Sequence, residues 1–313
     1  MERRTGKIIS DPVGSFLLAL LSQIIWGSAF VLIKLAYKEF STTTVGDTIM
    51  FVAVRMLIAG LILLLVTIAS EKRLALPDKS EVGSVFIIGT VQIGLVYALQ
   101  FPSMIYTSSV HCSILNGSQI ITATLFAHLF FKDDHITFKK GLGCLIAFAG
   151  VVFCFLYGGD LGSISFRGEG MFFLSCTSFA LSSSLVRKLI KKTNSVVCSY
   201  SSLLIGGAEL LVLGLASGGR LGNGGARGWS LLIALSLISS VCFLLWNSLL
   251  KSNPVGRISV CQCINPITGA ILSSLLLGEK VLQTRYVVAL GLIAVGIVVV
   301  NGSFGSKDKC AGL

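Results

Sequence analysis

The residues in this sequence best suited to chemistry are amide side chains placed inside long apolar runs. Asn116 and Gln119 are three residues apart, and so are Gln262 and Asn265, which puts each pair on one face of a helix. Pro266 cannot donate a backbone hydrogen bond, so it frees the carbonyl of Gln262 and bends the helix at that level. Two hypotheses are open for these amides: they line a cavity, or they bond to neighbouring helices.

Aromatic and hydroxyl groups occur at similar depths in other apolar runs. Trp26 lies near the centre of the first run beside Ser28, where its ring is either the wall of a substrate cavity or a packed core aromatic. Gln92 and Gln100 are eight residues apart and therefore share a helix face. The remaining candidates for cavity walls or gates are Tyr97, Phe179, Trp246 and Asn247.

Two charged residues, Arg55 and Glu209, lie well inside apolar runs. They are at similar distances from the expected outer ends of their helices, so they share a depth. Three hypotheses are open. The two residues form an ion pair, they contact lipid headgroups, or Glu209 is a coupling carboxylate that exchanges protons during a transport cycle.

The composition identifies the surroundings of these groups. The sequence is 54% hydrophobic and 12% charged, with a mean hydropathy of +0.88. Soluble domains carry roughly 25% charged residues, and a single large core would still need a charged exterior. The chain must therefore be solvated mostly by lipid, as an all-α integral membrane protein. The nine cysteines show no spacing typical of paired metal ligands, so we interpret them as small hydrophobic residues and expect no metal site. No cofactor is expected either.

The apolar residues are grouped into runs of membrane-spanning length. A helix that crosses a bilayer needs about 20 mostly apolar residues, and the sequence contains ten such runs. The polar segments between several of them are short, which makes consecutive helices antiparallel and leaves no room for a soluble domain. The expected spans are 15–36, 47–69, 83–103, 106–131, 138–157, 168–189, 196–217, 229–250, 257–277 and 285–301.

The net charge of +11 is explained by this topology. If the N-terminus is cytoplasmic, most of the 25 Lys and Arg residues fall in cytoplasmic segments, as the positive-inside rule requires. We therefore expect a multi-pass protein of the plasma membrane whose tails, residues 1–14 and 302–313, are both cytoplasmic. A nucleic-acid partner is excluded, because topology already accounts for the basic residues.

The second half of the chain is similar to the first. An offset of 146 residues lays Asp133–Val152 on Glu279–Val298 and also superposes the two amide pairs. We expect two repeats of five helices each, residues 15–157 and 168–301. Because five is odd, the second repeat enters the membrane from the opposite side. Inverted repeats of this kind are typical of transporters.

Three segments of the apolar runs match a known sequence pattern: WGSAFVLIK, FVAVRMLIAG and INPITGAILSSLLLGEKV. With these segments, and with ten runs in two sets of five, the chain resembles the drug/metabolite transporter superfamily and its EamA-domain members over roughly residues 15–301. The first half departs from the family pattern, with Gln119 and Ile120 where a proline is expected and FKDD in place of LGE. The resemblance implies efflux or exchange of a small metabolite. It also implies that the last helix of each repeat, helices 5 and 10, forms a packing or homodimer surface.

The function favoured by the sequence is secondary active transport by alternating access around a cavity at the membrane midplane. The candidate lining of amides, hydroxyls and aromatic rings suits a small polar metabolite, with export of an amino-acid-like compound favoured. No nucleotide-binding loop is present, so a gradient of substrate or of protons would supply the energy. The alternatives are a passive facilitator or channel and a non-transporting scaffold. An enzyme is not expected, because no nucleophile with a base or paired carboxylates lie at compatible depths.

Overall fold

The computed structural model describes residues 9, 11–72, 75–107, 112, 115–131, 136–156, 165–190, 194–277 and 284–302. All regular elements in these ranges are helices. The first half contains α2 (Pro12–Glu39), α3 (Val45–Glu71), α4 (Val82–Ile88), the π-helix η1 (Gly89–Leu95), α5 (Val96–Ser103), α7 (Ser118–Phe130) and α8 (Phe138–Leu156). The second half contains the π-helix η3 (Phe166–Gly170), α9 (Met171–Leu189), α10 (Ser195–Ala216), α11 (Gly225–Ser252), α12 (Val255–Ser259), the 3₁₀-helix η4 (Val260–Cys263), α13 (Ile264–Leu277) and α14 (Thr284–Gly302).

Each of the ten predicted apolar runs contains at least one of these helices. Six continuous helical stretches of the described chain are long and apolar enough to cross a membrane: Val13–Glu39, Val45–Glu71, Val82–Ser103, Phe166–Leu189, Ser195–Ala216 and Gly225–Ser252. The helix Ser118–Phe130 is apolar but shorter. The prediction of a helical membrane protein is therefore confirmed, whereas the count of ten spans stays a prediction. The predicted tails lie mostly outside the described residues.

The first two helices begin at well-formed caps. The backbone N–H of Gly14 donates to Oδ2 of Asp11 at 2.7 Å, which satisfies one of the free donors at the start of α2. At the start of α3, Thr44 and Asp47 form a reciprocal capping box with two hydrogen bonds of 3.1 Å. These caps fix the ends of the helices that carry Trp26 and Arg55.

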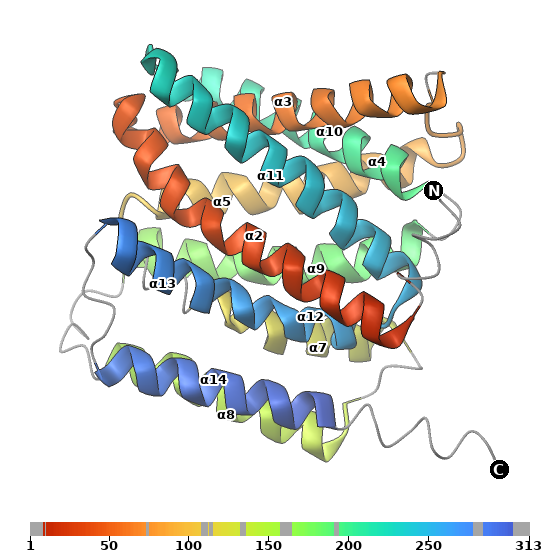
Figure 1. Cartoon of the computed structure of the whole chain (residues 1–313), viewed down its shortest axis with the longest axis vertical. Helices are drawn as coiled ribbons and strands as arrows, with labels where there is room; N and C mark the ends of the chain where they lie inside the picture. Colours follow the sequence, from red (N-terminus) through yellow and green to blue (C-terminus); the bar gives the residue numbers. More distant parts are fainter. Residues whose placement is uncertain are drawn as a thin grey trace.

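The helices pair in a regular order. α3 packs along α10, α8 packs along α14, and these two pairs lie at opposite ends of the molecule in Figure 1. Between them, α2 contacts α11 and α13, while α9 contacts α5 and α7. This pattern is unchanged when each helix is exchanged for the helix at the corresponding position of the other half.

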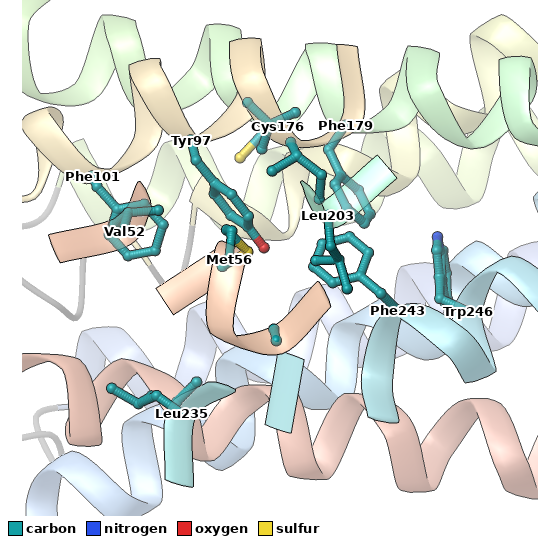
Figure 2. Close-up of a cluster of buried hydrophobic side chains, with 14 of the residues drawn as sticks. Val52, Met56, Tyr97, Phe101, Cys176, Phe179, Leu203, Leu235, Phe243 and Trp246 are labelled. Carbon is teal, nitrogen blue, oxygen red and sulfur yellow. The ribbon is translucent and has the colours of Figure 1, made fainter. Parts of the chain in front are cut away.

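The core and the outer surface are both apolar. Buried side chains of α2, α3, α5, α9, α10 and α11 form one continuous cluster, part of which is shown in Figure 2. Large apolar side chains are also exposed on the outer faces of several helices, where lipid rather than water would solvate them. They include Leu17, Leu65, Phe86, Leu125, Val212 and Leu275.

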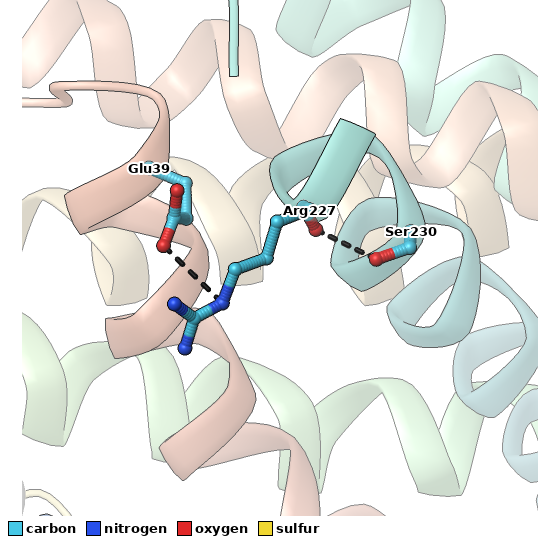
Figure 3. Close-up of polar contacts among 3 residues, drawn as sticks. All are labelled: Glu39, Arg227 and Ser230. Atoms are coloured by element: carbon cyan, nitrogen blue, oxygen red, sulfur yellow. Dashed lines mark hydrogen bonds and ion pairs between the residues drawn. The ribbon is translucent and has the colours of Figure 1, made fainter. Parts of the chain in front are cut away.

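A surface ion pair connects the last turn of α2 to the first turn of α11. Nε of Arg227 lies 3.4 Å from Oε1 of Glu39, and the hydroxyl of Ser230 donates to the carbonyl of Arg227 at 2.7 Å (Figure 3). The side chain of Arg227 is 72% exposed, so this pair contributes little to stability. Arg227 is therefore a charged residue that can be replaced without disturbing the core.

Candidate functional site

A cavity lies between the helices of the bundle, with about 50 Å³ of space for the centres of water-sized molecules. Its walls come from α2, α3, α5, α7, α9, η4 and α13 and from Asn116, so both halves of the chain contribute to it. The structure brings together there most of the residues that the sequence singled out: Trp26, Tyr97, Gln100, Asn116, Gln119, Phe179, Gln262 and Asn265. Arg55 also lines this cavity.

Aromatic rings form one wall. The half-buried ring of Trp26 packs edge to face against Phe179, at 5.6 Å between ring centroids, and against Phe243, at 4.9 Å. Figure 2 shows Phe179 and Phe243 in the buried cluster with Tyr97 and Trp246. Trp26 thus has packing partners on one side and the cavity on the other, which combines the two hypotheses made for it.

The amide side chains form the polar part of the wall. Nδ2 of Asn265 donates to Oε1 of Gln23 on α2 at 3.3 Å, and Nε2 of Gln119 donates to Oδ1 of Asn116. Among the described residues, Oε1 of Gln262, Oδ1 of Asn265 and Nε2 of Gln23 are buried and have no hydrogen-bond partner. Because unpaired buried polar groups are uncommon, these three atoms suit a ligand that supplies both donors and acceptors.

The amide wall depends on a close approach of α2 to α13. A Cβ atom at Gly27 would lie 2.7 Å from the carbonyl oxygen of Asn265 and 2.8 Å from Cβ of Thr268. Gly27 is therefore required for this helix contact. The helical run that contains Gln262 changes from the 3₁₀-helix η4 to α13 between Cys263 and Ile264. The side chain of Pro266 lies outside the described part of the structure. The predicted bend therefore falls where the backbone is irregular.

Arg55 is 1% exposed and is held by few groups. Its Nε donates to the hydroxyl of Ser239 on α11 at 3.2 Å, and its Cζ lies 5.3 Å from the ring centroid of Phe101 and 5.9 Å from that of Tyr97. These are cation–π distances. Within the described chain, Nη1 of Arg55 has no hydrogen-bond partner and no carboxylate lines the cavity.

Glu209 on α10 lies apart from the cavity lining and has partners other than Arg55. Its Oε1 accepts a hydrogen bond from the hydroxyl of Thr90 at 2.6 Å, and its Oε2 occupies the space where a Cβ of Gly94 would be. Both contacts are with the π-helix η1, and irregular turns of this kind are frequent at functional sites. The Arg55–Glu209 ion pair, one of the three hypotheses, is not formed in the described structure.

Four other predicted residues are described but lie outside the cavity lining. Gln92 donates to Asn247 at 3.1 Å, Asn247 donates to Ser199 at 3.0 Å, and Trp246 lies 3.4 Å from the hydroxyl of Ser183. The hydroxyl of Ser28 donates to a carbonyl of its own helix at 2.7 Å. These four residues therefore bond within or between helices.

Gln92 and Gln100 lie on one helical stretch but have different surroundings. Eight residues of a regular α-helix turn about 80° beyond two full turns, so side chains at this spacing lie on one broad side of the helix and can still meet different neighbours. Gln92 is carried by the π-helix η1, and Gln100 by α5. Gln92 points to α11, whereas Gln100 lines the cavity.

Several lining residues were not predicted from the sequence. Gln23, Phe30 and Ile33 come from α2, and Phe101 comes from α5. Gln23 precedes Trp26 by three residues and Phe30 follows it by four, so helical spacing from Trp26 could have identified both. Phe101 follows Tyr97 by four residues, so the same spacing could have identified it.

Comparison with known proteins agrees with this architecture. The EamA-like transporter family matches residues 14–156 and again residues 166–302. The uncharacterized transporter YyaM of Bacillus subtilis is 24% identical over 95% of this chain and 98% of its own length. An uncharacterized transporter of Archaeoglobus fulgidus is 24% identical over 90% of this chain and 96% of its own length.

The uncharacterized transporter YvbV of Bacillus subtilis is 26% identical over 95% of this chain and 94% of its own length. A protein of known crystal structure has the same fold, with a TM-score of 0.74 and 15% identity over 94% of this chain and 99% of that one. Since the family match covers nearly the whole sequence, the chain belongs to the EamA-like transporter family and is a membrane transporter.

Proposed function

We propose that this protein is a secondary active transporter in which residues 15–157 and 168–301 form two inverted halves that move around the central cavity. The observation that carries the proposal is a buried polar and aromatic cavity whose lining comes from helices of both halves. The exchangeable pairing of helices and the two separate family matches support a relation between the halves. Alternating access would then expose the cavity first to one side and then to the other.

The substrate that we infer is a small polar metabolite, and export of an amino-acid-like compound fits best. The cavity offers amide donors and acceptors for polar groups, and the rings of Trp26, Tyr97 and Phe179 for an apolar body. The proposed location is the plasma membrane, with both termini in the cytoplasm.

Flux measurements on the purified protein in lipid vesicles test this function. Radiolabelled amino acids would be exchanged across the membrane, with alanine placed singly at Asn116, Gln119, Gln262 and Asn265. We expect reduced flux with a normal yield of folded protein, and the larger losses of flux at Gln262 and Asn265. Unchanged flux in all four variants would remove the cavity from the mechanism. If the substrate never accumulates beyond equal concentrations on the two sides under any gradient, a passive facilitator would be favoured.

We further propose that Glu209 couples transport to protons. The supporting observation is a half-buried carboxylate in a membrane helix, bonded to Thr90 of the π-helix η1. Glu209→Gln keeps the shape of the side chain and an oxygen that can accept the hydrogen bond from Thr90, but its amide group cannot exchange a proton. The variant should lose the dependence of flux on a pH gradient while it retains exchange at equal pH. A retained dependence would end this proposal.

The pairing of α8 with α14 supports a packing role for helices 5 and 10. Gly143 and Gly150 on α8 and Gly296 on α14 are buried, and the two helices pack along each other within one chain. Small residues allow helices to approach closely in membranes. We infer that these glycines serve the contact between α8 and α14 within one chain. A homodimer would use the remaining outer faces, which crosslinking in vesicles can test.

A further inference from the structure

Arg55 is a buried cation that has no carboxylate partner in the part of the chain that the structure describes. Its guanidinium stays protonated under all physiological conditions, and no carboxylate among the described residues lines the cavity that it faces. The rings of Tyr97 and Phe101 attract the charge, but they accept no strong hydrogen bond. Nη1 therefore remains a charged donor that has no acceptor among the described residues.

Such an arrangement is unfavourable for the empty protein. An isolated buried charge costs several kcal/mol, and an apolar side chain of similar size would usually stabilise the same position better. A ligand carrying a negative group would supply both the missing charge and the missing acceptor. Because Ser239 holds Nε, the guanidinium is already oriented for that ligand.

The remaining walls limit what the anion is. Arg55 is the one charged side chain among the described lining residues, which matches a single negative charge better than a phosphate dianion. The rings of Trp26, Tyr97 and Phe101 suit an apolar body. The unpaired oxygens of Gln262 and Asn265 suit an N–H or O–H donor on the ligand.

We propose that Arg55 is the carboxylate-recognition residue of the cavity and that the substrate is a small monocarboxylate with an apolar body. An α-amino acid belongs to this class, since its ammonium group supplies the donors that the amide oxygens lack. The biological meaning rests on the proposed transport function, but binding can be measured without transport. A residue that only joined α3 to α11 through Ser239 would have no preference for carboxylates.

Thermal unfolding of the full-length protein in detergent provides the test. The probes are L-leucine, L-phenylalanine, isocaproate and phenylacetate, each compared with its own carboxamide. The amide keeps the shape and removes the charge. We expect at least one carboxylate to raise the unfolding temperature with an apparent affinity ten or more times that of its amide. Equal affinities, or no response to any of the four carboxylates, would overturn the proposal.

Variants then assign the preference to Arg55. Arg55→Met should lower the affinity for the carboxylate at least tenfold and leave the weak binding of the amide unchanged, while Arg55→Lys should retain part of the preference. Arg227→Gln is the matched control, since it removes an arginine far from the core. If Arg55→Met does not fold, Ser239→Ala should weaken carboxylate binding a few-fold by releasing Nε. Wild-type affinity in Arg55→Lys and Ser239→Ala together would contradict the assignment.

The outcomes for binding and for transport are distinguishable. A carboxylate preference that depends on Arg55 without any flux in vesicles would support the binding site and refute the transport mechanism. Flux of the same probe that is unaffected by Arg55→Lys and Arg55→Met would support transport and refute the role of Arg55.

Discussion

The two amide pairs occupy corresponding positions in the two halves, but their hydrogen bonds differ. Asn116 and Gln119 bond to each other, and Cys176 on α9 lies 3.8 Å from the same Asn116 oxygen. Asn265 instead bonds across to Gln23 on α2, and the side-chain oxygens of Gln262 and Asn265 have no partner within the described chain.

This difference separates structural amides from binding amides. A pair in which the donor of one amide is bonded to the oxygen of the other stabilises the helix that carries it and has less capacity left for a ligand. A pair with unpaired buried oxygens is costly in the empty protein, and a ligand can recover that cost. We therefore expect the second-half pair to dominate substrate binding, although both pairs line the cavity.

The largest effect is expected from replacing Gln262 and Asn265 by alanine together. The change removes two ligand contacts and leaves Gln23 without its partner, each worth about 1 kcal/mol. The ratio of kcat to KM for vesicle flux should fall by about 30- to 100-fold. The same double change at Asn116 and Gln119 is the control. An equal or larger loss in the control would show that the two pairs do not differ in function.

A smaller effect is expected from Gly27→Ala. The added Cβ would press on the carbonyl oxygen of Asn265 and separate α2 from α13, and overpacking of this kind costs about 1–3 kcal/mol. Ala180 holds the corresponding position on α9 and already carries a Cβ, so the first-half contact lacks this restriction. Thermal unfolding and flux should both decline.

Gly83→Ala on α4 is the control for the glycine variant, because a Cβ there would meet nothing within 4 Å. Its unfolding temperature should match or exceed that of the wild type, since alanine favours helix. A Gly27→Ala variant that behaves like this control would mean that α2 and α13 are not closely held at the amide wall.

The helices of this fold were largely predictable, because the length of an apolar run is a local property of the sequence. The lining of the cavity was predictable where regular spacing held, as for Gln262 and Asn265. It failed for Gln92, because its partner Asn247 lies on α11, and which helix packs against Gln92 is not a local property of the sequence. It was incomplete for Arg55, whose position was identified but whose partners depend on how α3 packs against α5 and α11.

A modest effect is expected from Asn116→Ala alone. The variant removes the acceptor of Gln119 and leaves that amide buried with an unpaired donor, which costs about 1–3 kcal/mol of stability. Flux should change by less than about threefold, since the lost bond is within the protein. Denaturation in detergent and vesicle flux measure the two quantities. A variant with wild-type stability and strongly reduced flux would assign Asn116 to the ligand instead.

The smallest effect is expected from Gln92→Met, which tests an amide that lies outside the cavity lining. Methionine has a similar volume and removes the hydrogen bond to Asn247, which leaves the Asn247 oxygen unpaired. It also removes the oxygen of Gln92, which itself has no partner among the described residues. The two changes oppose each other, so stability should shift by less than about 1 kcal/mol. Flux should stay within about twofold of the wild type, and a large loss of flux would place η1 in the transport cycle.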